Sequence, residues 1–253
     1  MFTKAIVRKP SKSMTQGLTS VNLGAPDYEK AVIQHQEYIN ALLICGVDVT
    51  VLEADENYPD SCFVEDVALC TPNCAVITRP GAESRRGEII EMQEVLKEYY
   101  EHIEQIEEPG TLEAGDIMMV GDHYYIGLSA RTNQNGADQM IEILKNHGMT
   151  ATIVPSMKVL HLKTGLAYLE NNKLLISGEF LENPVFDSFN KIEIKKKDTY
   201  SANCIWVNDT VLMPAGFPAS KPILEKLPYK LIELDMSEFQ KLDGGLSCLS
   251  LRF

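Results

Sequence analysis

The sequence lacks the features that would place the protein in a membrane or on nucleic acid. No apolar run in its 253 residues approaches the roughly 18 residues that a transmembrane helix needs. The first eight residues have neither the apolar core nor the cleavage site of a secretion signal, so we expect a cytoplasmic protein. Positive charge is scarce, since 23 Lys and Arg stand against 36 Asp and Glu. The resulting net charge of −13 argues against binding to nucleic acid or anionic membranes.

Cysteine is also too scarce for a disulfide-stapled scaffold, with six in the chain. Cys70 and Cys74 lie four residues apart, but no histidine or second close cysteine pair accompanies them, so no zinc site is expected. One cysteine could be a nucleophile, which composition alone does not identify. Five of them lie in apolar runs or turns and are interpreted as packing residues: Cys45, Cys62, Cys70, Cys74 and Cys204.

No Ser/Gly-rich linker divides the chain, and the longest run of like charge is Lys195–Lys197, which we expect to be a solvated turn. Hydrophobic residues make up 45% and charged residues 23%, as in ordinary globular proteins. A chain of this length can bury a sizeable core. We therefore predict one domain, residues 1–253.

What the sequence does contain is a repeated pattern of two apolar runs around a short polar turn, typical of β-hairpins. It occurs at 67–77, 117–127, 166–176 and 204–213. Helical periodicity follows between Asp27, as the N-cap, and Gly46, and in three further segments: Ile89–Tyr99, Ala137–His147 and the short Ser220–Leu227. An apolar strand follows each helix: Val47–Leu52, Ile103–Ile106, Thr152–Val154 and Leu231–Leu234.

The repeating unit is therefore a hairpin, a helix and a strand. Four units are visible, and the N-terminal strand Ala5–Val7 could complete a fifth with the last segment of the chain. Repeats of this size are usually arranged radially or as a solenoid. If rotation relates the units, the segments that follow their outer strands meet at one end: Asp60–Asp66, Glu113–Asp116, His161 and Asp243–Cys248. Several carboxylates, one histidine and one cysteine suit nucleophilic catalysis on a cation.

Cys248 is the strongest candidate for a nucleophile. Leu249, Leu251 and Phe253 alternate with more polar residues, which predicts a terminal strand with Cys248 pointing away from its apolar face. The two preceding glycines would let the backbone approach a ligand closely. The alternative is a buried, inert cysteine, the usual state of this residue.

The other candidates also have structural alternatives. His161 lies in an apolar run, where a histidine is more often a core residue than a catalyst. The carboxylates of Glu65, Asp66 and Glu113 adjoin strand starts, where burial requires a paired cation. Their structural partner would be one of the arginines at 79, 85, 86 and 131, and arginine can equally capture a carboxylate ligand. The segment 14–24 is either a lid or an ordinary loop.

Five motifs resemble those of dimethylarginine dimethylaminohydrolases, especially the short bacterial enzymes: Phe63–Asp66, Glu113–Asp116, Arg131–Asn133, Leu160–Lys163 and Asp243–Cys248. The resemblance extends from Met1 to Phe253, with the motifs in the same order. The family belongs to the guanidine-modifying superfamily. The resemblance thus implies a single-domain α/β fold, a five-bladed α/β propeller of repeated ββαβ modules.

The resemblance also implies residue roles. Cys248 is the expected nucleophile and His161 the general acid and base. Glu113 and Asp66 are expected to hold the guanidinium, with Glu113 counted among the catalytic residues. Substrate-binding roles are implied for a further set: Leu18 through its backbone, Asp60, Glu65, Arg85, Arg131 and Leu242. The implied hydrolase converts Nω-methylated arginines to citrulline and dimethylamine or methylamine through an S-alkylthiouronium on the cysteine, without a metal or organic cofactor.

Two rival functions stay open. An arginine deiminase would use the same nucleophile and histidine but release ammonia, and known deiminases are usually longer, with an added helical region. A catalytically silent arginine-binding protein is disfavoured by the joint presence of Cys248, His161 and Glu113. The expected partner is a small molecule, methylated arginine. A homodimer is left open, because the sequence does not determine the oligomeric state.

Overall fold

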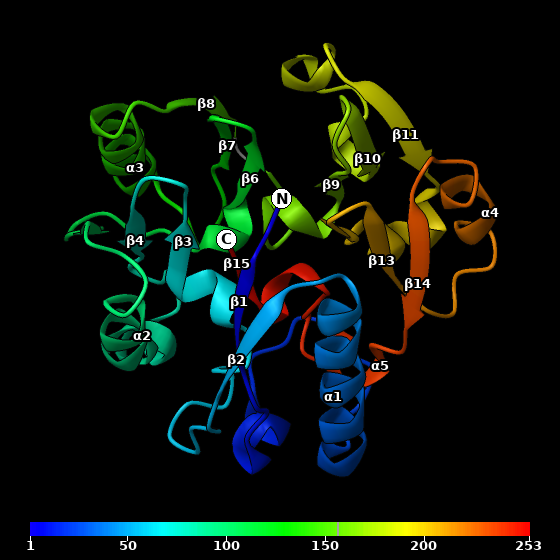
Figure 1. Cartoon of the computed structure of the whole chain (residues 1–253), viewed down its shortest axis with the longest axis horizontal. Helices are drawn as coiled ribbons and strands as arrows, with labels where there is room; N and C mark the ends of the chain where they lie inside the picture. The colour runs from blue at the N-terminus through cyan, green and yellow to red at the C-terminus, as the bar shows by residue number, and fades with distance from the viewer. Residues whose placement is uncertain (156) are drawn as a thin grey trace. The chain divides into compact units, whose positions relative to one another are not determined.

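The computed structural model describes residues 1–155 and 157–253, which form two compact units. The first unit joins Met1–Val64 to Gly165–Phe253, and the second is Glu65–Thr164. Each unit is built from three-stranded sheets of one type, five in all among the described residues. In every sheet the middle strand pairs antiparallel with one neighbour and parallel with the other. Figure 1 shows the elements of both units.

The second unit contains two modules, each a hairpin followed by a helix and a parallel strand. The first module comprises β3 (Ala68–Cys70), β4 (Ala75–Ile77), α2 (Ile89–Leu96) and β5 (Ile103–Gln105). The second comprises β6 (Ile117–Val120), β7 (His123–Gly127), α3 (Gln134–Asn146) and β8 (Thr150–Val154). Val76, Ile126 and Leu144 belong to one buried cluster, so strands of both sheets and α3 share a core. The 3-10 turns η3 (Glu83–Glu88) and η4 (Ala114–Asp116) lie between these elements, η2 (Val64–Val67) precedes β3, and η5 (Leu162–Thr164) follows β8.

The first unit contains three modules, one of which joins the two ends of the chain. Its strands are β1 (Lys4–Arg8), β2 (Asp48–Leu52) and β15 (Leu251–Arg252), with α1 (Tyr28–Ile44) between β1 and β2. β1 pairs in parallel with β2 and antiparallel with β15, and Figure 1 shows β1 beside β2. The N–H groups of Thr3 and Lys4 both donate to the carbonyl of Phe253. The predicted fifth unit, completed by the N-terminal strand and the last segment, is therefore confirmed.

The remaining modules of the first unit differ in their connections. One comprises β9 (Leu166–Tyr168), β10 (Lys173–Ser177) and β11 (Asn190–Ile194), joined by the turns η6 (Gly178–Phe180) and η7 (Pro184–Phe186) in place of an α-helix. The other comprises β12 (Ile205–Val207), β13 (Thr210–Pro214), α4 (Lys221–Leu224) and β14 (Lys230–Leu234). The turns η1 (Lys12–Gln16), η8 (Lys196–Ala202) and η9 (Ser247–Leu249) and the helix α5 (Ser237–Gln240) complete the unit.

Local signals in the sequence account for most of these elements. Asp27 accepts a hydrogen bond from the N–H of Lys30 and so begins α1, and Gly46 follows the helix at φ +79°, where glycine avoids the strain of a side chain. All four predicted hairpins are present. The helix expected at Ser220–Leu227 is shorter, because only Lys221–Leu224 is helical.

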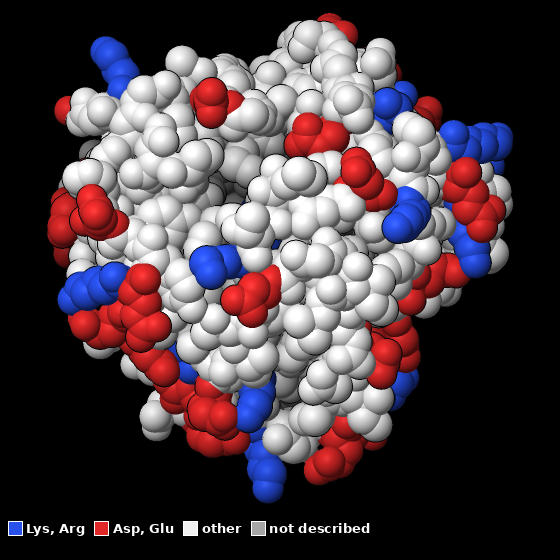
Figure 2. Space-filling view, in the orientation of Figure 1, with Lys and Arg blue, Asp and Glu red and all other residues white. Residues whose placement is uncertain are grey.

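Two predictions about the sheets need correction. β11 was not predicted, since its sequence alternates polar and apolar residues and no helical pattern precedes it. The expected terminal strand through Cys248 is wrong: residues Ser247–Leu249 form the turn η9, and only Leu251–Arg252 is strand. Among the described residues, no helix has both the length and the apolar character that a membrane crossing demands. The face drawn in Figure 2 carries several acidic clusters, as the net charge of −13 implies.

Candidate active site

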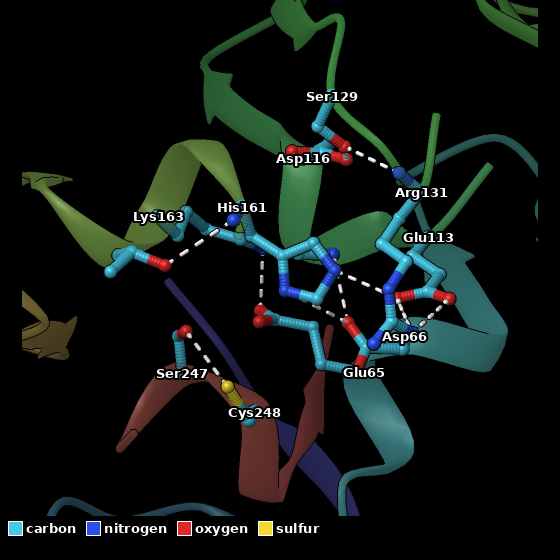
Figure 3. Close-up of polar contacts among 12 residues, drawn as sticks. Glu65, Asp66, Glu113, Asp116, Ser129, Arg131, His161, Lys163, Ser247 and Cys248 are labelled. Atoms are coloured by element: carbon cyan, nitrogen blue, oxygen red, sulfur yellow. Dashed lines mark hydrogen bonds and ion pairs between the residues drawn. The ribbon is translucent and has the colours of Figure 1, made fainter. Parts of the chain in front are cut away.

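The second unit holds a buried group of charged side chains around His161 (Figure 3). The imidazole Nε2 lies 2.7 Å from Oε2 of Glu113, and Nδ1 lies 3.9 Å from Oδ1 of Asp66. Glu113 is fully buried, while Asp66 and His161 are 3% and 7% exposed. The three come from separate segments, which follow β5, precede β3 and follow β8 respectively. The prediction that these segments supply one site is therefore met for His161, Glu113 and Asp66.

Electrostatics in this group favour a charged histidine. Burial alone lowers the pKa of His161, but the carboxylates of Asp66, Glu113 and Asp116 outweigh burial and raise that pKa to about 9. For Glu113, burial raises the pKa, yet His161, Arg85 and Arg131 oppose it and hold the pKa below its usual range. An imidazolium beside a carboxylate is thus the stable state near neutral pH, and it can act as a general acid.

Each of the two carboxylates also binds an arginine. Arg131 Nη1 lies 3.1 Å from Oε1 of Glu113, and Arg85 Nη1 donates to Asp66 Oδ2. Glu88 accepts from Nε and Nη2 of Arg85, at 3.0 and 2.8 Å. The expectation of a structural arginine partner is therefore met. Arg85 is only 4% exposed, so it is a buried partner of these carboxylates. The Arg131 side chain keeps 20% of its surface exposed.

Glu65, next to Asp66, is also buried. Its Oε1 lies 2.6 Å from Nζ of Lys163, two residues beyond His161. Counted together, the buried carboxylates at positions 65, 66, 88, 113 and 116 outnumber the three permanent cations at 85, 131 and 163 by two. Protonated His161 reduces that excess to one. A group of this charge suits a cationic ligand.

Gly115 lets these side chains approach one another. A Cβ at this position would lie 2.8 Å from both Asp66 Oδ1 and His161 Nδ1, closer than real Cβ contacts. Its N–H also donates to Asp66 Oδ1 at 3.3 Å. Any side chain here would displace the imidazole or the carboxylate, so the site requires glycine.

Asp66, Glu113 and His161 each offer one potential metal-ligand atom, and the three atoms lie within 4.8 Å of one another. All three side chains are already hydrogen-bonded to Arg85, Arg131 or each other. A guanidinium therefore fits this donor set, because the guanidinium groups of Arg85 and Arg131 already contact Asp66 and Glu113, two of the three side chains.

Cys248 belongs to the first unit, in η9, and is 9% exposed. The N–H of Gly245 donates to its Sγ at 3.4 Å, and Ser247 Oγ lies 3.9 Å from the sulfur, the contact drawn in Figure 3. The sulfur of Cys248 thus accepts a defined hydrogen bond from the backbone of its own turn. For Cys204, burial raises the pKa of the thiol. Cys204 thus fits its predicted packing role.

The loop that carries Cys248 is held by Asn203. The side chain of Asn203 accepts the N–H of Ser247 at 3.0 Å and donates to Ser247 Oγ at 3.1 Å. A Cβ on Gly245 would lie 2.5 Å from the Asn203 amide, and one on Gly244 would lie 2.2 Å from the ring of Phe63. These glycines serve close packing of the loop, which explains why the segment turns rather than extends.

Three of the residues with implied substrate-binding roles gather elsewhere in the first unit. The N–H of Leu18 donates to both carboxylate oxygens of Asp60, at 3.0 and 3.2 Å. A Cβ on Gly17 would lie 2.8 Å from Asp60 Oδ1 and 3.2 Å from Leu242 Cδ1, so Leu242 borders the same place. In the segment 14–24, Leu18 is 41% exposed and the N–H of Ser20 donates to Asp243.

Several residues that organise the site were not predicted. They are Glu88, Thr132, Lys163, Asn203 and Asp116. Asp116 stood in a quoted motif, but no role was assigned to it. Lys163 also stood in a motif, but no local signal pairs it with Glu65, 98 positions away. Thr132 stood in the quoted motif Arg131–Asn133 without a role of its own, and nothing in the sequence distinguishes Asn203 from other polar residues near turns.

Comparison with known proteins decides the family. The family model for "N,N dimethylarginine dimethylhydrolase, eukaryotic" matches residues 25–248. The chain is 58% identical to the N(G),N(G)-dimethylarginine dimethylaminohydrolase of Pseudomonas aeruginosa, and the match covers 100% of both chains. The chain belongs to the dimethylarginine dimethylaminohydrolase family.

Solved structures of this family agree with the fold. A cysteine-to-serine mutant of the Pseudomonas aeruginosa enzyme, complexed with citrulline, matches with a TM-score of 0.99 at 58% identity over 100% of both chains. An adduct of a histidine-to-glycine dimethylarginine dimethylaminohydrolase with S-methyl-L-thiocitrulline matches with the same score, identity and coverage. Together with the five sheets, these likenesses confirm the predicted fold class, an α/β propeller of five repeated modules.

Proposed function

We propose that this protein hydrolyses Nω-methylated arginines to citrulline, releasing dimethylamine or methylamine. It is a hydrolase of a non-peptide carbon–nitrogen bond in an amidine. The observation that carries the proposal is the buried His161–Glu113–Asp66 group, in a chain 58% identical to a named enzyme of this activity. The citrulline complex of the related structure supports the same product.

The proposed guanidinium site consists of Glu113 and Asp66. Both accept hydrogen bonds from arginine side chains of the protein itself, so the geometry for a guanidinium is already present. Two carboxylates that hold the substrate group fix its plane and present its carbon for attack. The excess negative charge of the cluster favours a cationic substrate over a neutral product.

The proposed chemistry has two stages. The thiolate of Cys248 bonds to the guanidinium carbon, and the carbon–nitrogen bond to dimethylamine breaks as His161 gives that nitrogen its proton. The thiouronium remains on the sulfur. Neutral His161 then takes a proton from water and the hydroxide bonds to the same carbon. The carbon–sulfur bond breaks as the hydroxyl proton passes to the leaving sulfur, which releases citrulline and the Cys248 thiol. With its pKa raised to about 9, His161 is protonated for the first stage and a strong base once it has lost that proton.

The substrate's amino-acid end requires further contacts. We assign its carboxylate to Arg131 and Arg85. The partial exposure of the Arg131 side chain supports the first assignment. Arg85 forms ion pairs with Asp66 and Glu88, so its contact with the substrate carboxylate stays a prediction. Asp60, the backbone of Leu18, Glu65 and Leu242 stay predictions for the remaining contacts and the pocket wall: their burial or proximity to one another is compatible with these roles. The segment 14–24 keeps both of its sequence-based alternatives, a lid and an ordinary loop.

The function is tested by competition between asymmetric dimethylarginine and arginine at equal concentrations, with dimethylamine and ammonia quantified separately. We expect dimethylamine release to dominate and Cys248→Ser to abolish it. Faster ammonia release would favour an arginine deiminase. Binding of either amino acid without turnover would favour the catalytically silent alternative.

Three further predictions accompany this function. The cytoplasmic location is tested by cell fractionation, and the single domain 1–253 by one cooperative unfolding transition seen by several probes. Activity should survive exhaustive treatment with a chelator, because the proposed steps use no metal. The oligomeric state, for which the sequence leaves a homodimer open, is measured by light scattering coupled to gel filtration.

A further inference from the structure

Asp116 is a fully buried carboxylate that takes no part in the bond-making and bond-breaking steps above. Its Oδ2 accepts hydrogen bonds from Ser129 Oγ at 2.6 Å and Thr132 Oγ1 at 2.7 Å. Its Oδ1 accepts the backbone N–H of Leu162 at 2.9 Å. All three donors are directed at its oxygens, which is the pattern of an ionised carboxylate.

This carboxylate sets the direction of the hydrogen bonds around it. A hydroxyl has one proton to donate, and Ser129 and Thr132 both donate theirs to Asp116. Their oxygens are left to accept. Ser129 Oγ accepts the N–H of Arg131 at 3.0 Å and that of Thr132 at 3.2 Å, and Thr132 Oγ1 accepts the N–H of Glu113 at 3.2 Å. Two of the proposed active-site residues therefore have their backbone held through hydroxyls that Asp116 orients.

The other oxygen of Asp116 reaches the histidine segment. Leu162, whose N–H it accepts, directly follows His161. Asp116 is thus bonded on one side to the turn that carries Arg131 and on the other to the backbone beside His161. In Figure 3 Ser129 and Asp116 lie together next to Arg131.

We infer that Asp116 is a positioning residue for the reaction: it aligns Arg131 with the substrate carboxylate and His161 with the leaving group through one set of hydrogen bonds. This inference rests on the proposed function. It goes further, because it makes substrate binding and proton transfer depend on a carboxylate that touches neither substrate nor reacting atoms.

The charge of Asp116 supports the same role. Burial raises its pKa, and the bonds from Ser129, Thr132 and Leu162 oppose that effect. The ionised side chain is one of three carboxylates that raise the pKa of His161. Removing its charge should therefore lower the pKa of His161, which a purely structural role would not do.

The first experiment compares Asp116→Asn with Asp122→Asn, an exposed aspartate in the turn of the same β6–β7 hairpin. We expect Asp116→Asn to lower kcat/KM about ten- to hundredfold, with a higher KM, a lower kcat and an alkaline limb of the pH–rate profile moved to lower pH. Asp122→Asn should match the wild type. An Asp116→Asn enzyme with normal KM and an unmoved pH profile would overturn the inference.

A second pair of variants keeps the test valid if Asp116→Asn folds poorly. Thr132→Val removes the hydroxyl with little change of shape, and Thr132→Ser keeps it. Because the role requires the hydroxyl, we expect Thr132→Val to raise KM about tenfold or more and Thr132→Ser to restore most of the loss. Equal kinetics for the two variants would contradict the inference.

Direct titration of His161 separates this inference from the proposed function. NMR of histidine-labelled protein reports the imidazole pKa without any turnover. A lower pKa in Asp116→Asn than in wild type supports the coupling even if methylated arginine is not the substrate. An unchanged pKa in an enzyme that turns over methylated arginine refutes the coupling and leaves the function intact.

Discussion

Replacing His161 by asparagine should change how the stability of the protein depends on pH. In the folded chain the buried carboxylates raise the pKa of this histidine from its ordinary 6.5 to about 9. The folded state therefore binds the proton more tightly than the unfolded state does. The resulting stabilisation is fully present below pH 6.5 and is lost as the pH rises through about 9.

The magnitude follows from the two pKa values. A tenfold change in proton affinity corresponds to about 1.4 kcal/mol, so the difference amounts to ~3 kcal/mol. The assay is urea unfolding of wild type and His161→Asn, followed by circular dichroism from pH 6 to pH 10. The difference in unfolding free energy between the two proteins should shrink by ~3 kcal/mol over this range, most of it between pH 7 and 9.

His35 supplies a control of opposite sign. Burial lowers its pKa to about 4, so its linked stability is lost between pH 6.5 and 4 as the pH falls. His35→Asn should therefore leave the slope between pH 7 and 10 unchanged. If the curves of wild type and His161→Asn run parallel from pH 6 to 10, the carboxylates do not hold a proton on His161, and its assignment as general acid fails.

Three other substitutions test separate parts of the site. Cys248→Ser should abolish citrulline formation while the circular dichroism spectrum stays native; residual turnover above about 1% would point to another nucleophile. Arg131→Ala should chiefly raise KM, by about ten- to hundredfold, because one charged hydrogen bond to the substrate carboxylate is lost. A larger effect on kcat than on KM would refute that role. Gly115→Ala should lower kcat at least about tenfold, since its Cβ would meet the His161 ring at 2.8 Å; wild-type kinetics would show that the imidazole does not need this approach.

Much of the architecture could be predicted from local patterns. The hairpins are recognisable in the sequence by their polar turns. Asparagine and aspartate occupy these turns because the backbone there has positive φ, as at Asn171, Asn172, Asn208 and Asp209. β11 was not predicted because the strand is partly exposed and the segment that joins it to β10 has no helical periodicity. The alternation after Cys248 was misleading, since Asn203 and the close-packed glycines hold that segment as a turn.

The site was only partly predictable for a different reason. Motif resemblance pointed to His161, Glu113 and Asp66, and the structure brings these three side chains together. The side chains that orient them are distant in sequence and act through hydrogen bonds that no spacing encodes, as Thr132 does for Glu113. Their roles depend on which hydrogen-bond donors and acceptors lie next to one another once the chain is folded, and the sequence alone does not show this.

The central claim is that Cys248 forms a covalent bond to the substrate carbon and that His161 completes the hydrolysis. The most direct measurement is intact-protein mass spectrometry of His161→Gly after incubation with S-methyl-L-thiocitrulline, whose thiolate leaves without help from an acid, followed by peptide mapping. The account predicts an accumulating thiouronium adduct on Cys248 and little citrulline. Normal citrulline formation without an adduct, or an adduct on another cysteine, would contradict it.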